Sequence, residues 1–230
     1  MLKKGRKPAN LFKTMSGIWW ILITGAPWNQ LPAYFGKWNS VYRFFSRWTK
    51  RGLFRELLER MVRRHNRDRY KVIDATHIKV HQDACHFAQS PEQQGFGKTK
   101  GGRNSKLSAV TNSQGKLLNL KLVPGNQADI KSAVEVLGNV RNKIVIGDKG
   151  YDSDELRNHI FVNGGTVAIP PKKSRTRFVL YSECFGRMRY VVENYFCRIK
   201  RYRRIDTRYD RRADNYLSFV FLASSMDWLK

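Results

Sequence analysis

Hydrophobic residues recur at helical spacing over the first third of the chain and predict three helices. The first covers residues 12–25, with an apolar side that ends at Gly25 and Pro27, two residues that stop helices. The second is expected to begin at an Asn39–Ser40 cap and to end at Gly52. A third helix with leucine-rich periodicity follows over residues 53–66.

From Lys71 onward the spacing of apolar residues changes to that of an α/β core. Polar and glycine-rich residues between 81 and 104 predict a loop. Strands are expected at 71–80, 142–150 and 166–172, a hairpin at 105–125 that turns at Ser113-Gln114-Gly115, and helices at 128–140, 152–165, 187–204 and 212–229. This order predicts an α/β fold with a mixed sheet flanked by helices. We expect residues 1–69 to form a basic arm and a helical region, and residues 70–230 to form the core domain.

The helix predicted over residues 187–204 combines a basic surface with a single acid, Glu193. At about 100° per residue, one side of it is an apolar stripe made of Val192, Tyr195, Phe196, Ile199 and Tyr202. Arg189, Glu193 and Lys200 cluster on a neighbouring face, so Glu193 is expected at the border of the face that packs on the sheet. A surface ion pair with Arg189, worth about 0.3–0.5 kcal/mol, is the simpler explanation of that acid.

Charge indicates a polyanionic partner. The 230 residues include 44 Lys or Arg and 18 Asp or Glu, which gives a formal net charge of +26. Nucleic acid is the first candidate, because neutralising phosphates releases counterions, and an anionic membrane surface is the second. The helices of residues 1–69, rich in Trp and Arg, are accordingly interpreted as a helix-turn-helix-like DNA-binding region; a helical cap over a core explains them about as well.

Cysteines and apolar runs argue against several other classes of protein. The three cysteines (Cys85, Cys184 and Cys197) form no C-x-x-C pair, which argues against a disulfide framework and a structural zinc site and fits a reducing cytoplasm. The first residues lack the apolar run of a signal peptide, and the apolar run around Trp19 is too short to span a bilayer. We therefore expect a cytoplasmic protein without a membrane partner.

Two aspartates occupy positions where a strand favours other residues. Asp74 lies in the middle of a predicted strand, and Asp148 follows the carboxyl end of another, where ligand sites of α/β sheets form. One such aspartate is usually structural, but two of them together with Glu193 favour a functional site. Three carboxylates suit hard cations such as Mg²⁺ or Mn²⁺. Two such ions about 3.5–4 Å apart can activate an attacking oxygen and stabilise a leaving one.

Other polar residues have simpler explanations. Asp152 and Asp154 are expected to cap the helix that follows them, and His77 and His81 to be packed or to face phosphate rather than to bind metal. Residues 97–103 lack the spacing of a phosphate-binding P-loop and predict a flexible basic loop near DNA. The candidate DNA contacts are Lys98, Lys100, Arg103, Arg189, Lys200, Arg201, Arg203 and Arg204. Most tryptophans of the N-terminal helices are expected in the core: Trp19, Trp20, Trp38 and Trp48.

In combination these motifs resemble the bacterial insertion-sequence transposases of the DDE type, in the group called insertion-sequence family five of the insertion-sequence family four superfamily. The resemblance runs from about Lys4 to the end of the chain. It is carried, in family order, by GIWWILITGAPWNQLPAYFGKWNSVYRFFSRW, VIDATHIKVHQ, GGRNSKLSAV, LVPGNQADI, IGDKGYDSDELR, AIPPKK and RYVVENYFCRIKRYRRIDTRYDRRADNYLSFVFLA. Each motif alone is weak, whereas the set is specific.

The resemblance implies an RNase H-like core and an enzyme that cuts and joins DNA. It carries the catalytic and metal-binding triad onto Asp74, Asp148 and Glu193, which would hold two Mg²⁺ or Mn²⁺ ions. It implies that water attacks the phosphodiester at the end of the element, and that the freed 3′-OH then attacks target DNA. The implied partners are the terminal inverted repeats and the target duplex, bound by a homodimer in the nucleoid-containing cytoplasm of a bacterium.

Two departures from the family pattern leave alternatives open. The signature Tyr-x2-Arg-x3-Glu-x6-Lys is matched by Arg189, Glu193 and Lys200, but Gly186 occupies the tyrosine position. Relatives usually carry more residues ahead of the segment 3–10, so a shortened or frame-shifted product is one alternative. The other functions to weigh are an RNase H-like nuclease without strand transfer and an inactive DNA-binding remnant that represses its own element.

Overall fold

The computed structural model describes residues 10–85 and 93–230, and in this part of the chain a seven-stranded mixed sheet forms the centre. The main path runs β4-β3-β1-β5-β6: β3 is antiparallel to β1 and β4, whereas β5 is parallel to β1 and β6. Short β2 and β7 extend β3 and β1. The strands are β1 (Tyr70–Val80), β2 (Gly97–Thr99), β3 (Gly102–Thr111), β4 (Leu117–Pro124), β5 (Ile144–Ile146), β6 (Thr166–Ala168) and β7 (Thr207–Arg208). The predicted mixed sheet is confirmed.

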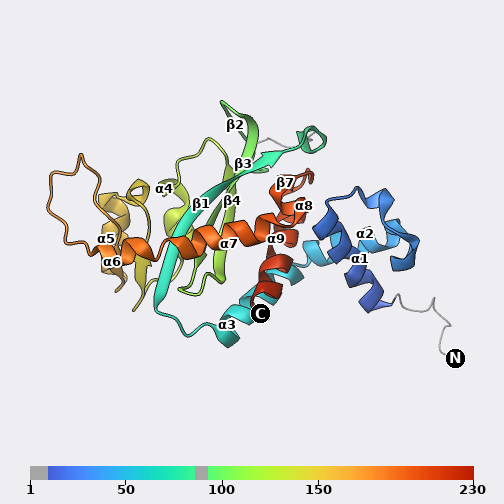
Figure 1. Ribbon diagram of the computed structural model, residues 1–230, viewed down its shortest axis with the longest axis horizontal. Coiled ribbons are helices and arrows are strands. Elements are labelled where there is room, and N and C mark those ends of the chain that lie inside the picture. Colours follow the sequence, from blue (N-terminus) through green and yellow to red (C-terminus); the bar gives the residue numbers. More distant parts are fainter. Residues whose placement is uncertain (1–9, 86–92) are drawn as a thin grey trace.

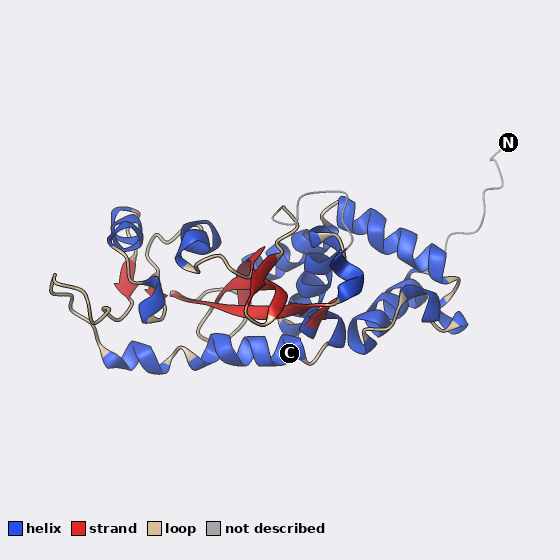
Figure 2. Cartoon of the chain, turned by 90° about the horizontal axis from the view of Figure 1, so that it is seen from above, coloured by secondary structure: helices blue, strands red, loops and turns tan. Residues whose placement is uncertain are grey.

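Helices cover both faces of the sheet (Figure 2). On one face lie α4 (Ile130–Leu137) and α5 (Asp154–Val162); on the other lie α7 (Tyr190–Lys200) and α9 (Ala213–Asp227). Successive strand residues point to opposite faces, so Ile73 packs under α4 and α5 while Val72 joins the core under α7 and α9. By the same alternation Asp74 faces the α7 side.

The first two N-terminal helices lie at one end of the molecule (Figure 1), and all three share the core of the α7 face. They are α1 (Leu11–Thr24), α2 (Trp38–Lys50) and α3 (Leu53–His65). Phe45 of α2 stacks on Phe219 of α9 at 4.5 Å between ring centroids, and the Thr49 hydroxyl donates a 2.9 Å hydrogen bond to that of Ser218. Trp19, Trp20 and Trp48 pack against this core as expected, whereas Trp38 is exposed.

The start of α2 was predicted wrongly. The helix begins at Trp38, and the Lys37 carbonyl accepts its first hydrogen bonds, from the N–H groups of Ser40 and Val41. No side chain caps it, so the Asn39–Ser40 cap is not formed. The burial of Val41 and Phe45 in the core sets the beginning of the helix instead of a local polar signal.

Two further predictions were wrong in part. Residues 97–104 are not a loop but a hairpin, in which Lys98 pairs with Arg103 across a turn that Gly102, at φ +97°, permits. The long helix over 187–204 is divided into α6 (Glu183–Arg187), α7 and α8 (Arg203–Asp206). After α7 the backbone at Tyr202 turns to an extended conformation, and its ring packs edge-on against Trp19 at 5.4 Å.

Within residues 10–85 and 93–230, no helix has the length and apolar character needed to cross a membrane.

Arg204 joins α8 to the N-terminal helices from a buried position. Its guanidinium makes a two-pronged ion pair with Asp210, at 3.0 and 2.9 Å, and donates to the carbonyls of Gly25 and Ala26 at the end of α1. Only 5% of the residue is exposed. Its assignment as a DNA contact is therefore wrong, because every face of the guanidinium is occupied by protein.

We expect Arg204→Ala to lower the free energy of unfolding by about 3–5 kcal/mol, because it leaves the Asp210 carboxylate buried and unpaired. Denaturant unfolding followed by circular dichroism would measure this. Arg203→Ala, one residue away and exposed, is the matched control and should change stability by less than about 0.5 kcal/mol. Equal losses in the two variants would contradict a specific role for the buried pair.

Candidate active site

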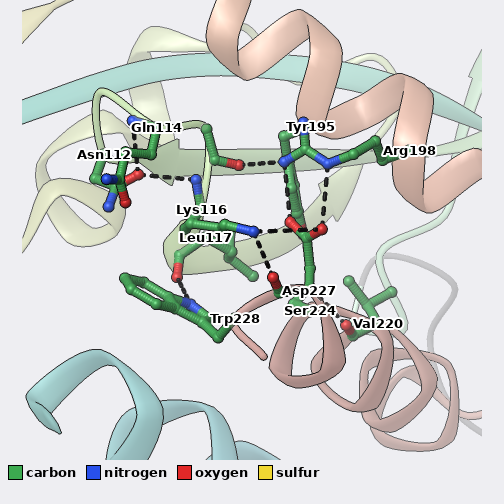
Figure 3. Close-up of polar contacts among 11 residues, drawn as sticks. Asn112, Gln114, Lys116, Leu117, Tyr195, Arg198, Val220, Ser224, Asp227 and Trp228 are labelled. Carbon is green, nitrogen blue, oxygen red and sulfur yellow. Dashed lines mark hydrogen bonds and ion pairs between the residues drawn. The ribbon is translucent and has the colours of Figure 1, made fainter. Parts of the chain in front are cut away.

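Polar contacts to the β3–β4 turn and to α9 hold helix α7 in position (Figure 3). Arg198 donates to the Gly115 carbonyl at 2.6 Å and to Asp227 at 2.9 Å, which joins α7 to the β3–β4 turn and to α9. One turn earlier, the Tyr195 hydroxyl bonds that of Ser224 at 2.8 Å. The buried residues of α7 include Val192, Tyr195, Phe196 and Ile199, so four of the five predicted stripe positions are buried, and Tyr202 is partly buried.

Gly115 in the β3–β4 turn allows this close approach. Its φ of +71° favours glycine, and a Cβ there would lie 2.8 Å from the Val191 carbonyl oxygen of α7. Sequence reasoning placed the turn correctly, but it gave no sign that the turn also supports the helix. Arg198 was equally hidden, because it is one of several basic residues in its segment.

Lys200 fixes the other end of α7 to the central strand. Its ammonium donates to the Thr76 hydroxyl at 2.8 Å and to the His77 carbonyl at 3.1 Å. It was predicted as a DNA contact, and the structure gives it a structural role as well, since these bonds hold α7 alongside β1. Thr76 and His77 follow Asp74 closely, so the same lysine sets the distance between the Glu193 helix and the Asp74 strand.

The sheet register places the two aspartates side by side. Val72 of β1 lies opposite Ile146 of β5 in a parallel pairing. Continuing that register by two residues puts Asp148 beside Asp74. The turn that carries Asp148 is supported by buried Tyr151, whose ring lies within 3.3 Å of the point where a Cβ on Gly147 would sit. Asp148 accepts a 2.8 Å hydrogen bond from the Gly150 N–H.

Electrostatics ties Glu193 to these aspartates. The pKa of Asp74 is raised to about 6, above all by burial, and the negative charges of Asp148 and Glu193 act in the same direction. A 2.8 Å hydrogen bond from the Ala75 N–H and the positive charge of Arg189 oppose this shift. Arg189 also contacts Glu193, at 3.5 Å. The structure therefore brings the three predicted carboxylates into one neighbourhood.

The donor set fits a hard divalent cation by its chemistry. All three side chains offer carboxylate oxygens, and mutual repulsion between them is relieved by a bound cation. In the described part of the chain, no three His, Cys, Asp or Glu side chains already converge as a metal-binding group. Glu193 is instead exposed and turned toward Arg189.

The remaining predicted DNA contacts differ in exposure. Arg201, Arg203, Lys98, Lys100 and Arg103 are exposed, with the last three on the β2–β3 hairpin, and their contact with DNA stays a prediction. Arg189 is partly buried at the beginning of α7. His77 is exposed, and His81 packs on the Tyr209 ring at 4.8 Å and lies 3.2 Å from Asp83.

Asp152 and Asp154 were predicted to cap the helix that follows them, and this prediction was wrong. Ser153 is the cap of α5, and it accepts from the Leu156 N–H at 3.1 Å. Asp152 is buried and binds Arg157 and Arg175 at 2.7 and 2.9 Å, while Asp154 is the first residue of α5 and pairs with Arg175 at 2.6 Å. Arg157 and Arg175 lie several residues or more away in sequence, so the local pattern predicted the nearby helix N-terminus as the partner of these acids instead.

Two protein-family models match this chain. Residues 1–58 match a protein-family model described as "Putative transposase of IS4/5 family". Residues 65–182, just over half of the chain, match the model "Transposase DDE domain". A Brucella ovis protein described as "Putative transposase for insertion sequence element IS6501" is 33% identical over 133 residues, which cover 55% of this chain and 98% of that protein.

Two solved structures show a weaker similarity. The crystal structure of a pre-cleavage Mos1 transpososome gives a TM-score of 0.32 at 11% identity, covering 98% of this chain and 80% of that chain. The catalytic domain of Mos1 mariner transposase gives a TM-score of 0.29 at 13% identity, covering 82% and 91%.

We expect Gly115→Ala to destabilise the fold by about 2 kcal/mol, because a side chain at positive φ is strained and its Cβ would press on the α7 backbone. Thermal unfolding would measure the change. Gly101→Ala is the control, since nothing lies within 4 Å of that position and its φ is not positive. A loss as large at Gly101 would show that the α7 contact is not the cause.

Asp152→Asn should destabilise the protein in a pH-dependent way. Hydrogen bonds from Arg175, Lys172 and Arg157 hold the pKa of this carboxyl at about 2, below its usual 3.8, although burial opposes the shift. A depressed pKa contributes stability above pH 3.8 that is lost as the pH falls through 2. The wild type should exceed Asp152→Asn by about 2 kcal/mol at pH 6, and the gap should close toward pH 2. A gap independent of pH in urea unfolding would refute this.

Proposed function

The chain belongs to the DDE transposase family of insertion sequences, whose enzymes cleave DNA and transfer strands with divalent metal ions, and on this premise we propose its specific reaction. It binds the ends of its element, cleaves them to free a 3′-OH, and joins that 3′-OH to target DNA. The observation that supports this most is that Asp148, two residues after the β5 residue paired with β1, and Glu193, on a clamped helix, both act electrostatically on Asp74.

Asp74, Asp148 and Glu193 would hold two Mg²⁺ or Mn²⁺ ions. When bound, the ions supply activation of the attacking oxygen and stabilisation of the leaving oxygen in each displacement. The chain itself positions the carboxylates: β1 and β5 fix the aspartates, and the Arg198 and Lys200 anchors fix Glu193. Arg189 leaves Glu193 and holds a phosphate when the substrate is present.

Exposed cations would hold the DNA on either side of this site. The β2–β3 hairpin contributes Lys98, Lys100 and Arg103, and the segment after α7 contributes Arg201 and Arg203. In the N-terminal region, a groove of about 880 Å³ is lined by the basic side chains of Lys13, Lys37, Arg43 and Arg47 and by the ring of Tyr34, with no acid among its lining residues. This groove supports the proposal that residues 1–69 form a DNA-binding region.

The two alternative functions explain less of the molecule. A DNA-binding remnant accounts for the charge of +26 but not for three carboxylates gathered where phosphates must approach. A nuclease without strand transfer would use the same site, and only its products differ. Because transposition joins two ends, we propose a homodimer on DNA, acting in the bacterial cytoplasm at the nucleoid.

Asp74→Ala should abolish Mg²⁺-dependent nicking of DNA that carries the element's ends, a loss of at least about 10³-fold, while DNA affinity is kept within about threefold. Gel analysis of labelled duplexes measures the nicking, and fluorescence anisotropy measures the affinity. The matched control is Asp206→Asn, an exposed aspartate outside the site.

Products labelled at the 3′ end distinguish the alternatives. Joining of the labelled 3′-OH to target DNA supports the transposase, and cleavage without joining supports the nuclease. Nicking that persists in Asp74→Ala would contradict the assignment of the catalytic triad. DNA binding without any nicking by the wild type would favour the inactive DNA-binding remnant.

A further inference from the structure

We propose that the Tyr181 hydroxyl is a phosphate-binding group of the active site, held in place by Gly186; this inference rests on the proposed function and adds a substrate contact to it. The residue comes from the segment between β6 and α6 and reaches the beginning of the helical stretch that carries Glu193. None of the motifs examined in the sequence includes it.

The first observation is the close approach of the Tyr181 hydroxyl to Gly186. A Cβ built on Gly186 would lie 2.9 Å from the Tyr181 hydroxyl oxygen. The φ of Gly186 is not positive, so its backbone does not require glycine. A side chain at position 186 would therefore displace the hydroxyl, which lies at the far end of a flexible side chain.

The second observation is the direction in which this contact lies. Arg189, the cap of α7, and Glu193 and Lys200 follow one another at spacings of four and seven residues, which places them along one side of α7, and Gly186 lies three residues before Arg189 in the short α6. Glu193 adjoins Asp74 on this side, and Lys200 is bonded to β1. Tyr181 therefore extends the row of active-site groups by one more position, beyond Arg189.

The third observation is unused hydrogen-bonding capacity. Tyr181 makes no side-chain hydrogen bond to any residue that the structure describes, and Arg189 Nε likewise has no partner there. Burial raises the pKa of the Tyr181 hydroxyl, and the charge of Glu183 acts in the same direction, whereas the charge of Arg189 lowers it, so the guanidinium and the hydroxyl lie in one neighbourhood. A hydroxyl donor beside a guanidinium, at the edge of a carboxylate cluster, suits a DNA phosphate oxygen next to the cleaved bond.

Substitutions at both positions test this assignment through the affinity for a short duplex that carries the element's end. Tyr181→Phe should weaken binding about tenfold, because one hydrogen bond to a charged phosphate is lost. Gly186→Ala should weaken it by a similar factor, since the new methyl group displaces the hydroxyl. In the Tyr181→Phe background, Gly186→Ala should cause no further loss, because the oxygen that it would meet is gone.

The matched control is Tyr190→Phe, which removes an exposed tyrosine hydroxyl from the first turn of α7. In that background Gly186→Ala should still cost about tenfold. A second readout replaces single phosphates by neutral methylphosphonates. Replacement of the phosphate that Tyr181 binds should weaken binding by the wild type but not by Tyr181→Phe. A tyrosine with a merely structural role would not produce this difference.

Three results would overturn the proposal: affinity of Tyr181→Phe equal to that of the wild type, additive losses in the double variant, or equal methylphosphonate effects in both proteins. Melting temperatures of all variants confirm that they are folded. The affinity measurements need no cleavage. A wild type that binds DNA but never nicks it would overturn the proposed transposition chemistry, and the binding data would still test the role of Tyr181.

Discussion

The position of α7 against the sheet is the constraint on which the candidate active site depends. Glu193 belongs to a helix, whereas Asp74 lies on β1 and Asp148 just after β5, so only tertiary contacts can bring them together. Those contacts come from three directions: the β3–β4 turn through Gly115, α9 through Asp227, and β1 through the bonds of Lys200 to Thr76 and His77. They lie at both ends of the helix and leave it little freedom to slide or rotate.

The scarcity of acids in a strongly basic chain makes their distribution informative. Several acids neutralise arginines: Asp152 and Asp154 bind Arg175, Asp210 binds Arg204, and Asp227 binds Arg198. By contrast, Asp74 and Asp148 form no ion pair with any described residue, and Asp74 is held at a raised pKa. A fold with so many cations had ready means to neutralise these two carboxylates. That they are left unpaired accords with a cation that arrives from solution.

Local pattern predicted those parts of the fold that local interactions decide. The alternation around Asp74, the turn at Gly115 and the apolar stripe of α7 were all read correctly, because each depends on neighbours in sequence. The breaks on either side of α7, the hairpin at 97–104 and the Ser153 cap were missed. Arg204 shows the reason most clearly: in sequence it is one more cation in a basic run, and its partners Gly25 and Ala26 lie far away in the chain.

The link between Arg204 and the end of α1 also bears on how such a chain can evolve. The Arg204 guanidinium donates hydrogen bonds to the carbonyls of Gly25 and Ala26, which lie far earlier in the sequence. The aromatic stack of Phe45 on Phe219 connects the same two regions. An N-terminal helical segment from a different protein would need carbonyl groups placed to accept from Arg204 and an aromatic ring placed to stack on Phe219. The two regions are therefore expected to be inherited together rather than exchanged separately.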